Sequence, residues 1–165
     1  MNRKIQICLM LAVCLLMLCA CSAGPAQPET EPAGTEAVHA DLTQLYTQMS
    51  EKLPQMIEMD QDMMLDYCGI DAQKCVQTVV AMNYNGLETD EIWLLEAVDG
   101  AAADTLEEMA QLRLKMKAEE TETYAPDQYA VVQKAQLLRK GNYVALIVTP
   151  EAAALSEMFN TALGQ

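Results

Sequence analysis

Two predicted β-hairpins constrain the fold of this chain more than any other feature of its sequence. Residues 75–84 alternate in character from one position to the next, which is typical of a strand with one buried face. Asn85-Gly86 is a turn signal, and residues 90–98 form a second, more apolar strand. We expect the two strands to pair as a hairpin whose loop is longer than the two-residue minimum.

The second predicted hairpin joins residues 134–139 to residues 142–148 through the turn Lys140-Gly141-Asn142. Residues 143–148 read Tyr-Val-Ala-Leu-Ile-Val, so both faces of this strand are apolar. A strand with one solvated face would alternate instead, and the run therefore predicts a strand in the interior of the sheet.

Four stretches with apolar residues at helical spacing surround the hairpins. They cover residues 41–53, the stretch from Asp60 to Gly69, residues 101–122, and the stretch from Thr149 to Ala162. The order α-α-β-β-α-β-β-α predicts an α+β fold, an antiparallel four-stranded sheet built from two hairpins with helices packed on one face.

On the longest helix the apolar stripe predicts which side chains face inward. The inward set is Leu106, Met109, Ala110 and Met116. The charged residues, among them Arg113 and Lys117, are expected on the solvated side.

The N-terminus carries the pattern of a bacterial lipoprotein signal peptide over residues 1–20. Asn2-Arg3-Lys4 provides the positive start, and residues 5–20 are almost entirely apolar. Leu18-Cys19-Ala20-Cys21 then resembles a lipobox, which predicts cleavage before Cys21 and a lipid on its thiol. An uncleaved transmembrane helix is the alternative, but the apolar run is short of the roughly 20 residues that span a bilayer.

Residues 21–39 are rich in Pro, Glu, Ala, Gly and Thr, which predicts a disordered tether between Cys21 and a single domain at residues 40–165. His39, the only histidine of the chain, ends this tether and is expected to be solvated. The net charge of −14 becomes −16 once the signal removes Arg3 and Lys4. Such a surface repels nucleic acid and anionic lipid headgroups, so membrane attachment is expected to depend on the lipid alone.

Three motifs of the domain resemble a family of domains of unknown function found in small lipoproteins of Gram-positive bacteria. They are Tyr67-Cys68-Gly69-Ile70-Asp71, Asp90-Glu91-Ile92-Trp93-Leu94-Leu95-Glu96-Ala97 and Lys140-Gly141-Asn142-Tyr143-Val144. The chain departs from the family pattern at Cys68 and Leu95, where the family often has Tyr and Phe. The resemblance covers roughly residues 41–163 and implies no activity, because its motifs are structural.

No catalytic or metal-binding pattern stands out in the predicted domain. It contains no histidine, which excludes a Ser-His-Asp or Cys-His set. Asp60-Gln61-Asp62 begins like a calcium loop, but Met64 and Leu65 occupy positions that need a ligand and a glycine. Cys68 and Cys75 are either two buried thiols or a disulfide. We therefore expect no catalytic residue, no metal and no cofactor.

These observations favour a lipid-anchored binding or accessory module at the outer face of the cytoplasmic membrane. Its partner would be an unknown protein or small ligand, and not a nucleic acid. The candidate binding surface is an exposed sheet face or edge near Asn83, Tyr84 and Trp93. The alternative is an extracytoplasmic hydrolase that uses carboxylates, since any two of 24 acidic residues could meet in the fold.

Overall fold

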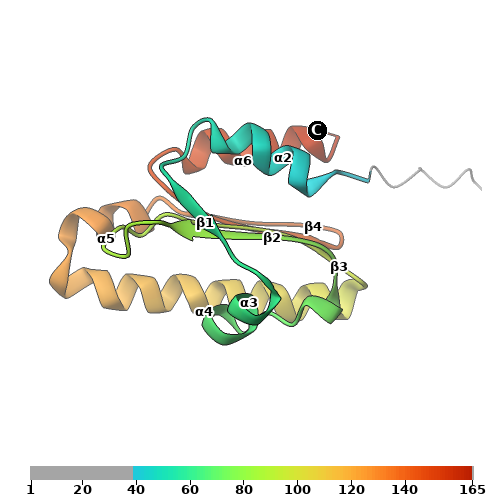
Figure 1. Cartoon of the computed structure of the whole chain (residues 1–165), viewed down its shortest axis with the longest axis horizontal. Helices are drawn as coiled ribbons and strands as arrows, with labels where there is room; N and C mark the ends of the chain where they lie inside the picture. The colour runs from blue at the N-terminus through green and yellow to red at the C-terminus, as the bar shows by residue number, and fades with distance from the viewer. Residues whose placement is uncertain (1–38, 165) are drawn as a thin grey trace, which may run out of the picture. The chain divides into compact units, whose positions relative to one another are not determined.

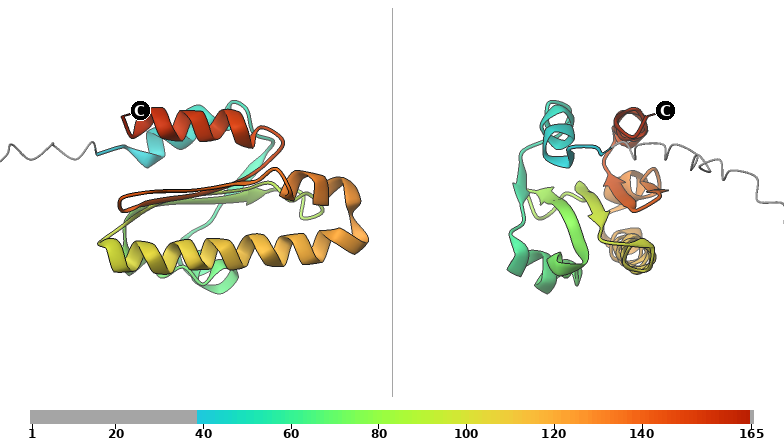
Figure 2. Two further views of the ribbon diagram at one scale, coloured as in Figure 1. Left: turned by 180° about the vertical axis from the view of Figure 1, so that it is seen from behind. Right: turned by 90° about the vertical axis from the view of Figure 1, so that its right-hand side faces the viewer.

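The computed structural model describes residues 39–164 and has three layers, with helices on both faces of one antiparallel sheet (Figures 1 and 2). Within these residues the sheet has five strands in the order β1-β2-β3-β5-β4. They are β1 (Met56–Glu58), β2 (Cys75–Asn83), β3 (Glu91–Ala97), β4 (Gln136–Lys140) and β5 (Tyr143–Val148).

Both predicted hairpins are confirmed. In the first, β2 pairs with β3, and Val80 lies opposite Trp93. In the second, β4 pairs with β5, and Gly141 adopts a φ of 54° in the turn. The two hairpins meet where β3 pairs with β5, so β5 is an interior strand as its apolar sequence predicts.

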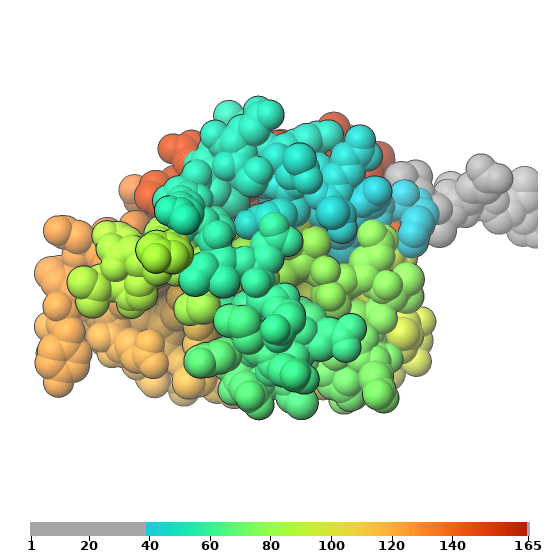
Figure 3. Space-filling model, in the orientation of Figure 1, coloured from blue at the N-terminus to red at the C-terminus, as the bar shows by residue number. Residues whose placement is uncertain are grey.

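The prediction of four strands is wrong by one. Met56–Glu58 pairs with β2 and forms an edge strand that the sequence presents only as a short extended piece between two helices. Three residues are too few to show an alternating pattern, because one cycle of alternation already takes two residues. The space-filling view shows that the chain from α2 through β1 to α3 covers much of this side of the domain (Figure 3).

Five α-helices and one short 3-10 helix complete the described part of the chain. They are α2 (Leu42–Ser50), α3 (Gln61–Cys68), η1 (Ala72–Lys74), α4 (Gly100–Tyr124), α5 (Pro126–Val132) and α6 (Ala152–Ala162). Asp41, Asp60 and Asp99 cap α2, α3 and α4 by accepting a hydrogen bond from a backbone N–H of the first turn. Gly69 ends α3 with a φ of 72°, the left-handed conformation that its sequence position predicts.

The helices divide between the two faces of the sheet, which corrects the expectation that one face carries them all. Helices α2 and α6 cover one face, here called the upper face, and α3, α4 and α5 cover the other, the lower face (Figure 2). Because β3 and β5 lie in the interior and are apolar on both faces, each face has a core of its own. Trp93, Leu95 and Leu106 belong to the lower core, and Leu94, Ile147 and Phe159 belong to the upper core.

No helix of the described residues is both long enough and apolar enough to cross a bilayer. The predicted signal peptide, the tether and Cys21 lie outside the residues that the structure describes.

Candidate functional site

Among the polar clusters of the described residues, two lie at opposite ends of strand β3. Glu91 begins the strand and lies on the lower face with Trp93 and Leu95. Glu96 lies near the end of the strand, on the upper face with Ile92 and Leu94, because successive side chains of a strand alternate. The two glutamates therefore lie in different cores and have different partners.

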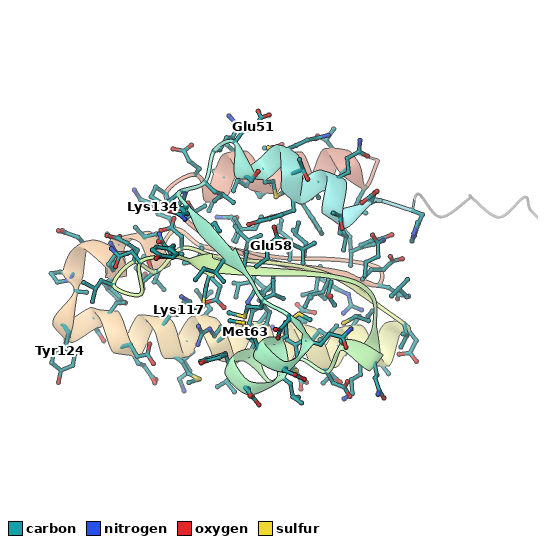
Figure 4. All side chains as sticks on the ribbon, in the orientation of Figure 1. Glu51, Glu58, Met63, Lys117, Tyr124 and Lys134 are labelled. Atoms are coloured by element: carbon teal, nitrogen blue, oxygen red, sulfur yellow. The ribbon has the colours of Figure 1, made fainter. Side chains whose placement is uncertain are left out.

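The lower cluster surrounds Glu91, whose side chain is completely buried. Arg113 and Lys117 stand four residues apart on α4, so both side chains reach the same spot on the strand. Arg113 donates from Nε and Nη2 to the carboxylate at 2.9 and 2.8 Å, and Lys117 Nζ lies 2.8 Å from Oε2. Trp93 Nε1 adds a hydrogen bond of 2.7 Å, and Figure 4 shows Lys117 between α4 and the sheet.

These contacts make the lower cluster a structural element. Burial raises the pKa of Glu91, but the hydrogen bond from Arg113 and the charges of Lys117 and Arg113 outweigh burial and hold the pKa below its ordinary value. A carboxyl of this kind stays ionised and cannot serve as a general acid near neutral pH.

The predicted faces of helix α4 are wrong at three positions. Lys117 and Arg113 are predicted to be solvated, but Lys117 is 7% exposed and the Arg113 side chain is 19% exposed, because both reach Glu91. Met116 is predicted to face inward, but it is 43% exposed.

The upper cluster surrounds Glu96, which remains 13% exposed. Its carboxylate accepts a hydrogen bond from Gln77 Nε2 at 2.6 Å and lies 3.2 Å from His39 Nδ1. Tyr143 lies opposite Glu96 in the sheet, and its hydroxyl is 3.4 Å from the same His39 nitrogen. Burial and the hydrogen bond to Glu96 raise the pKa of Tyr143, so its phenol remains protonated and donates its one O–H to Glu96.

The expectation that His39 is simply solvated is therefore incomplete. Its side chain is 64% exposed, yet it contacts Glu96, Tyr143 and Gln77. Gln77 also fixes the start of the domain, because it donates to Ala40 O at 2.9 Å and accepts from Leu42 N at 3.1 Å. The sequence could not show this cluster, since its members are separated by up to 104 residues.

A groove of about 520 Å³ opens on the upper face beside this cluster, between α2 and α6. Helix α2 and its cap contribute one row of lining residues, and α6 contributes another. His39 and Ala40 also line the groove. The lining from α2 and its cap is Asp41, Gln44, Leu45 and Gln48, and the lining from α6 is Glu157, Met158, Thr161 and Ala162. Its volume lies within the range of about 300–1,000 Å³ that is usual for ligand sites.

The structure places the three predicted binding-surface residues in different environments. Trp93 is completely buried in the lower core, where it supports Glu91, so it cannot belong to an exposed surface. Asn83 is buried and donates to Asp90 Oδ2 at 3.0 Å, whereas Tyr84 is 64% exposed at the start of the loop. Trp93 is excluded because the side chain of every second residue of β3 enters the lower core.

Cys68 and Cys75 are free thiols in the structure. Burial is the main cause that raises the pKa of each thiol to about 11. Thiols of this kind are almost entirely protonated near neutral pH and are poor nucleophiles. Cys68 Sγ contacts Met59 Sδ at 3.8 Å, which is the packing expected of a small apolar residue.

Among residues 39–164, no group of three or more His, Cys, Asp or Glu side chains is placed to hold a metal ion. The groove and the Glu96 cluster together are thus the best candidate site in this part of the chain. The sequence carried one usable signal for the groove, namely polar residues on the exposed sides of the first and last helices.

Comparison with protein families finds one match, a model described as "Domain of unknown function (DUF4358)", over residues 49–149. The match includes the whole sheet and the helices of the lower face, together with the C-terminal end of α2. Neither the curated proteins nor the solved structures contain a match to the chain.

Proposed function

Starting from the fact that the chain belongs to the DUF4358 family of domains of unknown function, we propose that it is a lipid-anchored binding module outside the cytoplasmic membrane. The groove between α2 and α6 is its ligand site. The observation that carries the proposal is the groove itself, a depression of about 520 Å³ with apolar and polar lining that includes His39 of the upper cluster.

Two further observations support binding rather than chemistry at the other polar groups. Both thiols are held in the protonated form by burial, and Glu91 is already occupied by Arg113, Lys117 and Trp93. The strongly negative charge of the chain supports a partner that is not a nucleic acid.

The membrane attachment rests on the lipobox-like sequence that ends at Cys21. Intact-mass spectrometry of protein from membranes should show cleavage before Cys21 and an added diacylglycerol. Cys21→Ala should leave an uncleaved or released protein. A wild-type protein that carries no acyl group would refute the anchor.

The groove is tested by placing a photo-cross-linking amino acid at Gln48, on its rim, and at Glu108 as the control. Glu108 is exposed on α4, on the opposite face of the sheet. We expect adducts in living cells from position 48 and none from position 108. Equal labelling at both positions, or none at position 48, contradicts the proposal.

A hydrolase is the second candidate, and the contact between His39 and Glu96 beside the groove favours it. A histidine next to a carboxylate is a common general base. In that case the purified protein would turn over a cell-wall or peptide substrate, and Glu96→Gln would abolish the turnover while the protein remained folded.

A further inference from the structure

The groove that we propose as the ligand site resembles surfaces that bind a helix. Asp41, Leu45 and Gln48 run along one side of α2 at intervals of four and three residues. Met158 and Ala162 form a parallel apolar row on α6. The two helices lie side by side on the upper face (Figure 2), and residues of both line the groove.

The floor of the groove is apolar and its rims are polar. Leu45 is buried, so the apolar surface that a ligand can cover comes from Met158 and Ala162, which are half-buried. Gln44, Gln48 and Thr161 stand on the rims. A floor of this kind inside a polar rim is the usual arrangement at sites that receive one face of an amphipathic segment.

The rims of the groove carry acidic residues and no Lys or Arg. The acidic residues that line it are Asp41 and Glu157. No Lys or Arg side chain within residues 39–164 forms an ion pair with either acid. The carboxylate of Glu157 is exposed, so a cationic partner would meet it without first displacing an internal counter-charge.

The groove is lined by side chains and not by the free edge of a sheet. This difference determines which backbone conformation a peptide ligand would have. An extended peptide gains affinity by pairing its N–H and C=O groups with a strand, and the groove runs between two helices whose own groups are already paired. A helix satisfies its backbone internally and presents only side chains. From Asp41 to Gln48 the groove spans about 10 Å, which is the length of two helical turns.

We infer that the groove binds an amphipathic helix of a partner protein, with apolar residues on the floor and Lys or Arg against Asp41 and Glu157. The inference rests on the proposed function of the same groove and adds the chemistry of the partner.

The test uses the full chain, purified in zwitterionic detergent, and a fluorescent peptide of Leu and Lys with Leu at helical spacing. A second peptide has Glu in place of each Lys, and a third has a central Pro that prevents the helix. Fluorescence anisotropy should show saturable binding of the first peptide and at least about tenfold weaker binding of the second and third. Micelles without protein give the background.

Two variants with the same change of charge localise the binding. Glu157→Lys should weaken the Leu-Lys peptide by about five- to tenfold, and Glu108→Lys, on the opposite face, should leave its affinity unchanged. Met158→Ala tests the floor and should also weaken binding. Thermal unfolding monitored by circular dichroism confirms that each variant is folded.

The inference is overturned if Glu157→Lys and Glu108→Lys have the same affinity, or if the peptide with Pro binds as well as the helical one. It is also overturned if the protein self-associates through the groove or binds a small polyamine as tightly as the peptide. Cross-linking at position 48 without peptide binding would refute a helical ligand but not the proposed function as a binding module. Failure of both experiments would refute both proposals.

Discussion

Strand β3 carries a glutamate near each end, and the two carboxylates lie on opposite faces of the sheet. Glu91 is completely buried and has two cationic partners and the Trp93 indole. Glu96 is partly exposed, and its partners are a glutamine amide, a phenol and an exposed histidine. The first cluster is buried and fully paired, whereas the second is partly exposed and borders a groove through His39.

The comparison shows why a buried and fully paired carboxylate is not the best functional candidate of the domain. A buried carboxylate between two cations is retained because each partner would be costly to leave alone in the core. A carboxylate that is partly exposed and has neutral or exposed partners, as Glu96 does, is less stabilised but remains accessible to solvent. The predictions below test this contrast between the lower cluster around Glu91 and the upper cluster around Glu96.

The largest effect is expected from Glu91→Gln. The substitution leaves Arg113 and Lys117 in the core without a counter-charge, which should cost about 3–5 kcal/mol of the free energy of unfolding. Glu96→Gln is the matched control and should cost about 1 kcal/mol, because only neutral or exposed partners are affected. Urea denaturation of the two variants and the wild type measures both values, and equal losses would contradict the contrast.

Low pH should decrease the free energy of unfolding, and protonation of Glu91 should account for part of the decrease. The pKa of Glu91 is lower in the folded than in the unfolded protein, where it lies near the ordinary value of 4.5. Its stabilising contribution is therefore complete above that pH and is lost as the pH falls through the folded pKa. The free energy of unfolding, measured between about pH 6 and about pH 3, should fall more steeply for the wild type than for Glu91→Gln.

A smaller loss is expected from Gln77→Ala. The side chain joins Ala40, Leu42 and Glu96, so its removal should cost about 1–3 kcal/mol and loosen the start of the domain. Gln73→Ala, at an exposed position just before the same strand, should change stability by less than about 0.5 kcal/mol. Amide hydrogen exchange of residues 40–42 should accelerate in the first variant only.

The smallest effect is expected from His39→Ala. An exposed side chain with contacts of 3.2–3.4 Å should contribute less than about 0.5 kcal/mol to stability. A loss above about 1 kcal/mol would show that His39 is an integral part of the upper cluster. Urea denaturation near neutral pH distinguishes the two results.

Much of the fold is predictable because its signals are local. The hairpin turn at Gly141, the end of α3 at Gly69 and the interior position of β5 all follow from short stretches of sequence. Strand β1 is missed because it is short, and α5 is absent from the four predicted helical stretches because its seven residues span only about two turns. The division of helices between two faces is missed because it depends on packing between distant elements.

The polar clusters are less predictable for a related reason. Arg113 and Lys117 lie on a helix rich in charged residues, and nothing near them indicates that Glu91 lies opposite. His39 and Glu96 are 57 positions apart in the numbering and meet only because β3 ends where the domain begins. A pairing of this kind is a property of the topology, and a single sequence does not display it.

The hydrogen bonds of Gln77 also have a mechanical consequence. Its amide ties Ala40 and Leu42 to β2, and Tyr143 on β5 accepts a hydrogen bond from Ala40 N. A pull applied to the chain at His39 would therefore act on β2 and β5 through these hydrogen bonds as well as on α2 through the backbone. The sheet would share the load with the helix that forms one wall of the groove.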